Sequence, residues 1–185
     1  MTHHLDLLEH SKQQTPQTPP PQTNFEKVIE FNQCFGVPVN NSPQSNICSD
    51  QPKLAELRLN LILEEVKELQ EAHKNNDFVE IVDAMADILY VVYGMGASYG
   101  VPLDNAFDIV HKSNMSKLCL TEKEALETVE WYKKQYTEKK SPYDSPSYRE
   151  GTYNGKHFWV VFNESTGKIL KNINYQIADF TSLLI

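Results

Sequence analysis

The sequence predicts a mainly α-helical protein, an antiparallel helical bundle with a small antiparallel β unit at its C-terminal end. Two segments with helical spacing of apolar residues, Leu54–Ala72 and Phe78–Ser98, are separated by a short polar turn. Such a short connection favours antiparallel packing of the two helices. Further helical patterns flank this pair, and β-rich sequence follows the last of them.

The chain is expected to divide into three parts. Residues 1–23 are rich in Gln, Pro and Thr, a composition that buries too little apolar surface to fold, so we expect a disordered tail. Residues 24–140 form the helical domain. Residues 141–185 form a β-rich extension, in which His157–Asn163 and Lys168–Tyr175 are expected to be strands joined by a turn.

The other helices have recognisable starts. Asn24 is expected to cap a first helix whose Val28 and Phe35 face the core, and Asp50 to cap the helix that begins near Pro52. Between them lies a long polar loop, which is either a plain connector or a wall of a nucleotide pocket. A helix is also expected near residues 102–118, and another, capped by Thr121, runs from there toward residue 136.

Charge and cysteine content exclude several classes of protein. The formal net charge is −8, which disfavours a general nucleic-acid binder. The three cysteines form no CxxC or zinc-type pattern, so we expect reduced thiols in the cytoplasm, with the nucleus as the alternative. The first ten residues lack the long apolar core of a signal peptide, and no apolar stretch is long enough to cross a membrane.

Carboxylates occur where a core helix should have none. In the first of the paired helices, Glu65 falls near the middle of the apolar arc, Glu68 lies inside it, and Glu64 sits at its edge. The second helix is apolar nearly all round, except for a stripe that includes Glu80, Asp83 and Asp87. No Lys or Arg occurs between residues 74 and 112, so local ion pairs cannot neutralise this stripe.

Burying several ionised carboxylates together is costly without compensation. They could take up protons, pair with distant basic groups or bind a cation, and a carboxylate-only cluster suits a hard cation such as Mg²⁺. The acids of the first helix alone would be typical of a solvated face, but the second stripe favours the cation. Arg58 shares the apolar face and is either an ion-pair partner or a phosphate ligand.

The motifs EExxE (Glu64–Glu68) and ExxD (Glu80–Asp83), followed by SNMSK (Ser113–Lys117), resemble the signature of the all-α nucleoside triphosphate pyrophosphohydrolases. These include MazG, the dimeric dUTPases, the dCTP pyrophosphatases and the phosphoribosyl-ATP pyrophosphohydrolases. The context LRLNLILEEVKEL, DAMADILYVVYG and VHKSNMSKL is most similar to the last branch. The resemblance covers roughly residues 25–118.

This resemblance implies Mg²⁺-dependent hydrolysis of a nucleotide between its α and β phosphates, with Mn²⁺ as the alternative metal, by a homodimer or homotetramer. It implies that Glu64 orients or deprotonates the attacking water. The implied metal ligands are Glu65, Glu68, Glu80 and Asp83, although the register leaves Asp87 as an alternative to Asp83. The candidate substrate contacts are Arg58, Asp87, Tyr90, Asn114 and Lys117.

Two rival functions would use the same residues. A di-iron bundle would need Glu-x-x-His on two helices, and neither acidic helix has this motif. A non-catalytic helical interaction or regulatory protein, whose acids pair with a basic partner, is the alternative function. The apolar surroundings expected for Glu65 and Asp83 favour the enzyme.

Overall fold

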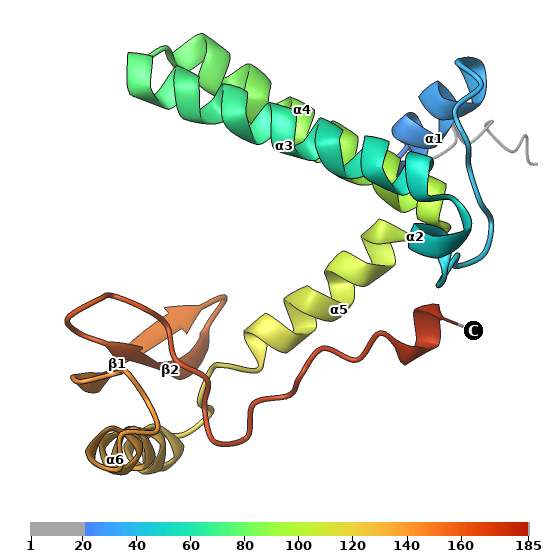
Figure 1. Ribbon diagram of the computed structural model, residues 1–185. Helices are drawn as coiled ribbons and strands as arrows, with labels where there is room; N and C mark the ends of the chain where they lie inside the picture. The colour runs from blue at the N-terminus through green and yellow to red at the C-terminus, as the bar shows by residue number, and fades with distance from the viewer. Residues whose placement is uncertain (1–20, 185) are drawn as a thin grey trace, which may run out of the picture.

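A computed structural model describes residues 21–184 and confirms the mainly helical fold with a small antiparallel sheet near its C-terminal end (Figure 1). Apart from residues 21–23, the predicted disordered tail lies outside the described residues. The elements are α1 (Asn24–Cys34), α2 (Ile47–Asp50), α3 (Pro52–Asn75), α4 (Phe78–Tyr99), α5 (Leu103–Met115), α6 (Glu122–Thr137), β1 (Pro146–Tyr153), β2 (Lys156–Asn163) and the 3₁₀ turn η1 (Thr181–Leu183).

The two predicted acidic helices, α3 and α4, form a long antiparallel hairpin (Figure 1). Asn76 ends α3 in the left-handed conformation, with φ 53°, which asparagine tolerates better than most residues. The side chain of Asp77 then accepts hydrogen bonds from the backbone N–H groups of Val79 and Glu80 and so caps α4. These two residues make the sharp reversal that the sequence predicted.

The loop between α1 and α2 crosses the C-terminal end of α4. The last carbonyls of a helix lack intrahelical partners, and here the loop supplies donors to three of them. The hydrogen bonds run from Asn40 N to Ala97 O (2.9 Å), from Asn40 Nδ2 to Ser98 O (2.6 Å) and from Gln44 N to Tyr99 O (2.9 Å). The loop therefore holds α4 directly, in addition to connecting two helices.

Two predicted helix caps were wrong by one residue. Thr23, not Asn24, caps α1, because its hydroxyl accepts from Glu26 N while the Glu26 carboxylate accepts from Thr23 N, a reciprocal pair that Asn24 cannot form. Asp50 ends the short helix α2, and Gln51 precedes Pro52 at the start of α3 without a side-chain cap.

The C-terminal unit consists of α6 packed against the two strands, and it contains the buried apolar cluster of the described residues. The cluster is Cys119, Ala125, Val129, Tyr132, Val161 and Leu170. Strands β1 and β2 pair antiparallel, with Pro146 opposite Asn163 and Tyr153 opposite Lys156. Asn154 and Gly155 make the turn between them with φ of 49° and 73°, as a two-residue hairpin turn requires.

The predicted pairing of β2 with Lys168–Tyr175 is present only next to the turn. There Ile169 bridges Phe162, and hydrogen bonds run from Asn163 N to Lys168 O and from Leu170 N to Val161 O, but the partner of β2 along its whole length is β1. An Asn-Gly pair is the stronger hairpin signal. The later residues of this segment bond to other parts of the chain, including α6 and the residues that follow α5.

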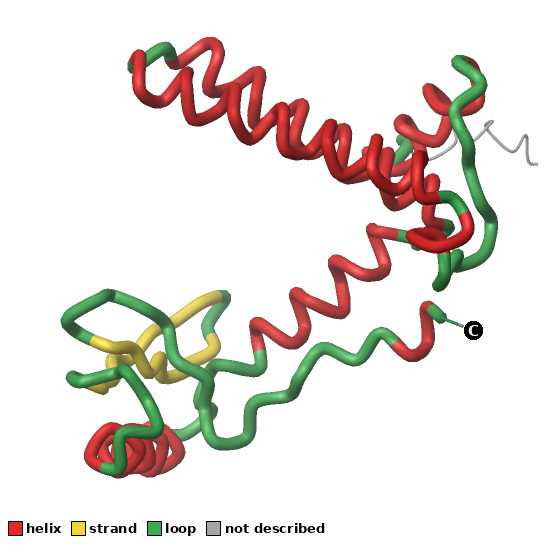
Figure 2. Tube along the Cα trace, viewed as in Figure 1, coloured by secondary structure: helices red, strands yellow, loops and turns green. Residues whose placement is uncertain are grey.

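Helix α5 leaves the base of the hairpin and ends beside the C-terminal unit, and the chain after β2 runs back along it as a loop (Figures 1 and 2). Within residues 21–184, none of the helices is long and apolar enough to span a membrane.

Candidate active site

The hairpin brings five of the predicted acidic residues together. Glu65 on α3 is half-buried, and its pKa is raised by this burial and then by the charges of Glu68, Asp87, Glu64 and Asp83. Carboxylates from both helices therefore lie close enough to Glu65 to raise its pKa, as expected for antiparallel packing of the two helices. Glu80 is not among the groups that raise this pKa, and it is exposed near the start of α4.

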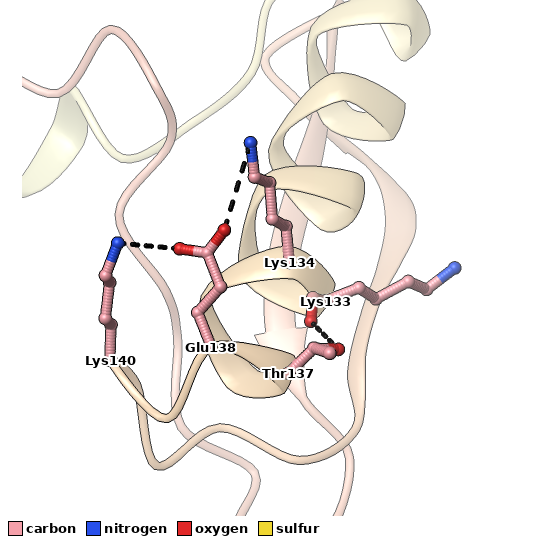
Figure 3. Close-up of polar contacts among 5 residues, drawn as sticks. All are labelled: Lys133, Lys134, Thr137, Glu138 and Lys140. Carbon is pink, nitrogen blue, oxygen red and sulfur yellow. Dashed lines mark hydrogen bonds and ion pairs between the residues drawn. The ribbon is translucent and has the colours of Figure 1, made fainter.

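No lysine or arginine pairs with these acids in the described part of the chain. The ion pairs of residues 21–184 lie instead in the C-terminal unit. Figure 3 shows one example, in which the Glu138 carboxylate lies 2.7 Å from Lys140 Nζ and 4.0 Å from Lys134 Nζ. Several acids in and next to α6 thus have neighbouring lysines, whereas those of the hairpin do not.

Carboxylates without a basic partner, grouped around a glutamate whose pKa is raised, are the type of oxygen ligand that suits a hard divalent cation. A bound cation would offset the repulsion that raises the pKa of Glu65. Within residues 21–184, however, no three Asp, Glu, His or Cys side chains approach one point closely enough to hold a metal ion. The carboxylates are therefore ligands of the right chemical type for a divalent cation, although their side chains do not surround a common point.

An aromatic cluster lies one helical turn from these acids. Tyr90 follows Asp87 by three residues on α4, and its ring meets Phe31 of α1 edge-on at 5.5 Å between centroids. Phe31 in turn stacks on Phe35 at 4.3 Å. The expectation that Phe35 faces the core was wrong, because this residue is 70% exposed. The i, i+4 spacing of the two phenylalanines was the signal that sequence reasoning missed.

Arg58 is buried at the base of the hairpin, away from solvent. Its Nε donates to Ser98 Oγ at 2.9 Å, and Ser98 Oγ donates to Pro38 O at 3.0 Å. Its Nη1 lies 3.2 Å from where a Cβ on Gly94 would stand, so the glycine makes room for the guanidinium. The Nη2 atom is buried without a hydrogen-bond partner, and burial lowers the pKa of Arg58. Contact with a substrate phosphate stays a prediction.

Asn114 and Lys117 lie at the far end of α5, where Lys117 Nζ donates to Asn114 Oδ1 at 2.7 Å. Because α5 leads away from the hairpin (Figure 1), these side chains stand apart from the acids of the same chain. A joint site with the acids would need the α5 of another copy.

Comparison with known proteins matches a family to the part of the chain that contains the hairpin. The model of the phosphoribosyl-ATP pyrophosphohydrolase family matches residues 28–114, which span α1 to the end of α5. The chain is also similar to the uncharacterized protein L479 of Acanthamoeba polyphaga mimivirus. The two are 31% identical over 247 aligned positions, covering 88% of this chain and 96% of that protein.

Proposed function

Since the chain belongs to the phosphoribosyl-ATP pyrophosphohydrolase family, within the MazG-like all-α nucleoside triphosphate pyrophosphohydrolase superfamily, we propose that it hydrolyses a nucleoside triphosphate between the α and β phosphates. The products would be a nucleoside monophosphate and pyrophosphate. The observation that carries this proposal is the group of unpaired carboxylates around Glu65, inside the segment that matches the family.

We take the roles of the side chains from the motifs that the chain shares with the family. Glu65, Glu68, Glu80 and Asp83 would hold Mg²⁺, or alternatively Mn²⁺, with Asp87 as the alternative to Asp83. When bound, the cation would neutralise phosphate charge and lower the pKa of a coordinated water.

Glu64 is exposed beside Glu65, where its carboxylate would accept the proton of the attacking water. As that water oxygen bonds to phosphorus, the bond to the bridging oxygen breaks, and the two products separate.

The aromatic cluster favours a nucleotide over a bare polyphosphate. Phe31 and Tyr90 are each 39% exposed, so both rings can contact a ligand. Stacking of a base on such rings contributes about 1–3 kcal/mol. We therefore propose that the base or sugar meets Tyr90 and its neighbours while the phosphates lie over the acids.

Self-association would complete the site. Two helices cannot by themselves enclose a bundle core, and large apolar side chains on both helices of the hairpin are exposed. They are Leu57, Leu59, Leu63, Val66, Val82, Met85 and Leu89. We propose that hairpins of two copies pack together as a homodimer, or within a homotetramer, which would bring Asn114 and Lys117 of one copy toward the acids of another.

Leu89 is 57% exposed, and Leu89→Lys should shift the protein toward monomer in sedimentation-velocity experiments. Leu126→Lys, on the exposed side of α6 at 47%, is the matched control and should not change the assembly. An unchanged assembly of the Leu89 variant, or a monomeric wild type, would count against packing of the hairpins.

The function is tested by incubating the full chain with ribo- and deoxyribonucleoside triphosphates and phosphoribosyl-ATP in the presence of Mg²⁺, and measuring pyrophosphate and monophosphate. We expect Glu65→Gln and Asp83→Asn to lower the rate about 100-fold or more, since each removes a charge that would stabilise the transition state by several kcal/mol. The control Glu71→Gln, on the exposed face of α3, should retain the rate. If the folded wild type hydrolyses none of these nucleotides, the non-catalytic interaction protein becomes the better explanation.

A further inference from the structure

We propose that the segment Asn172–Gln176, called the strap below, positions the phosphate-binding end of α5, so that Asn172 and Tyr175 are positioning residues for the reaction. This inference rests on the proposed function, because it takes Asn114 and Lys117 to be phosphate contacts. It gives the C-terminal extension a role in the active site of a chain whose family match ends at residue 114.

Helix α5 has little other support in a single chain. No other helix or strand of residues 21–184 packs extensively against it, and Phe107, near its middle, is 69% exposed. Its C-terminal end is different, because Ser113 is only 6% exposed and lies beneath the strap. The strap thus contacts this end of α5 directly, while Cys119, a few residues later, pairs with Trp159 of β2.

A chain of hydrogen bonds joins the strap to the two serines of SNMSK. Ser113 Oγ donates to Gln176 O at 2.8 Å, and it also lies 2.8 Å from the Tyr175 hydroxyl. Because a serine hydroxyl has one proton, Tyr175 must be the donor in the second bond. Gln176 N donates to Ser116 Oγ at 3.0 Å, and Ser116 Oγ donates to Ser113 O at 2.7 Å.

Asn172 holds the carbonyls at the end of the helix. Its Nδ2 donates to Ser116 O at 3.1 Å and to Leu118 O at 2.7 Å, and the residue is 6% exposed. Carbonyls at a helix end need such partners when they are covered. Replacing this amide would leave both carbonyls without a donor from the strap.

The strap is itself anchored to the C-terminal unit. Leu170, just before it, is 2% exposed in the apolar cluster. Ile173 N donates to Thr128 Oγ1 at 3.3 Å, and Asn174 Nδ2 donates to Glu124 Oε1 at 2.8 Å. A displacement of the strap would therefore strain its contacts with α6, so the unit can hold α5 in one position.

The bonding pattern divides the SNMSK motif into two kinds of residue. The protons of both serine hydroxyls are used within the protein, so these groups are structural. Asn114 is exposed and Lys117 half-buried, and they bond mainly to one another through Lys117 Nζ and Asn114 Oδ1. Asn114 Nδ2 and the ammonium of Lys117 therefore remain for phosphate oxygens.

Hydrogen–deuterium exchange tests the strap without reference to activity. In Tyr175→Phe and Asn172→Ala, peptides covering residues 112–118 should exchange several-fold faster than in the wild type, while α3 and α4 should be unchanged. The control Tyr153→Phe removes the same hydroxyl from a tyrosine that is 71% exposed at the end of β1, and it should change neither region. Unchanged exchange in residues 112–118 would overturn the proposal.

Kinetics test whether the strap serves the site. For the nucleotide that the wild type hydrolyses, Tyr175→Phe should lower kcat/KM roughly threefold to tenfold, about the effect of one hydrogen bond. The larger part should be a rise in KM, because phosphate contacts are already made in the bound substrate. Ser113→Ala combined with Tyr175→Phe should cost less than the sum of the single effects, since both remove the same bond.

The two proposals fail in different ways. If the wild type releases no pyrophosphate from any nucleotide, the proposed function fails, and exchange in residues 112–118 still decides whether the strap holds α5. If the wild type is active and Tyr175→Phe loosens α5 without changing kcat/KM, the function stands and the positioning role is overturned. A fall in kcat/KM with accelerated exchange throughout the chain would also overturn it, because general destabilisation would then be the cause.

Discussion

Replacing Gly100 with alanine should destabilise the protein far more than the same replacement at Gly36. Both glycines follow a helix and have nearly the same backbone conformation, with φ of +69° and +68°. An alanine in this left-handed region costs about 1 kcal/mol at either site. The two positions differ in what a new Cβ would meet.

At Gly36 nothing lies within 4 Å of the added atom, so about 1 kcal/mol is the whole effect. At Gly100 the Cβ would lie 1.9 Å from the carbonyl oxygen of Ser42, and the loop over α4 would have to move. Its three hydrogen bonds to the end of α4 would be at risk, at about 1 kcal/mol each. Gly100→Ala should therefore cost about 4 kcal/mol in total.

Thermal unfolding followed by far-ultraviolet circular dichroism at one protein concentration measures the difference. For a domain of this size, 1 kcal/mol corresponds to about 2–4 °C, so we expect the Tm of the transition that melts the hairpin to fall by about 3 °C in Gly36→Ala and about 12 °C in Gly100→Ala. Equal losses in the two variants would refute the close approach of the loop to α4.

Three further predictions concern charged groups. Arg58→Met should leave the free energy of unfolding unchanged or raise it, because the buried guanidinium has an unpaired nitrogen, and KM for the nucleotide should rise about tenfold if Arg58 binds phosphate; an unchanged KM would remove it from the site. Glu65→Gln should stabilise the metal-free protein in urea titrations at neutral pH, because the pKa of Glu65 is raised and its charged form is therefore unfavourable; addition of Mg²⁺ should stabilise the wild type and not this variant. Hydrogen bonds from Ser165, Ser145 and Asn163 lower the pKa of Asp144 from 3.8 to about 2. The stability that its carboxylate contributes should therefore be present above pH 3.8 and be lost as the pH falls toward 2. Measurements of the free energy of unfolding across this pH range should show the loss in the wild type and not in Asp144→Asn.

The grouping of the acids could be predicted from the sequence, because helical spacing and a short turn fix which residues face each other. Glu65 in an apolar arc and Asp87 on an apolar helix had to meet once α3 and α4 packed antiparallel. No contact from a distant segment was needed for that inference. The spacing of apolar residues along a helix predicts which side chains meet when the contacts lie within one helical hairpin.

The role of the SNMSK serines could not be predicted, because their partners lie about 60 residues away in a segment without regular structure. From the sequence alone the hydroxyl of Ser113 is compatible with a phosphate ligand or with a structural group, and its bond to Gln176 O in the fold favours the structural group. The exposed leucines are a related case. Their spacing indicates burial, but it does not say which surface covers them, and within residues 21–184 they remain exposed.

The position of the apolar cluster has a consequence for how the chain folds. All of its members lie between Cys119 and Leu170, so their contacts form within one segment of the chain and without a second molecule. The long hairpin, in contrast, leaves much of its apolar surface exposed and would be completed by association. We therefore expect unfolding in two steps, of which only the one that melts the hairpin shifts with protein concentration.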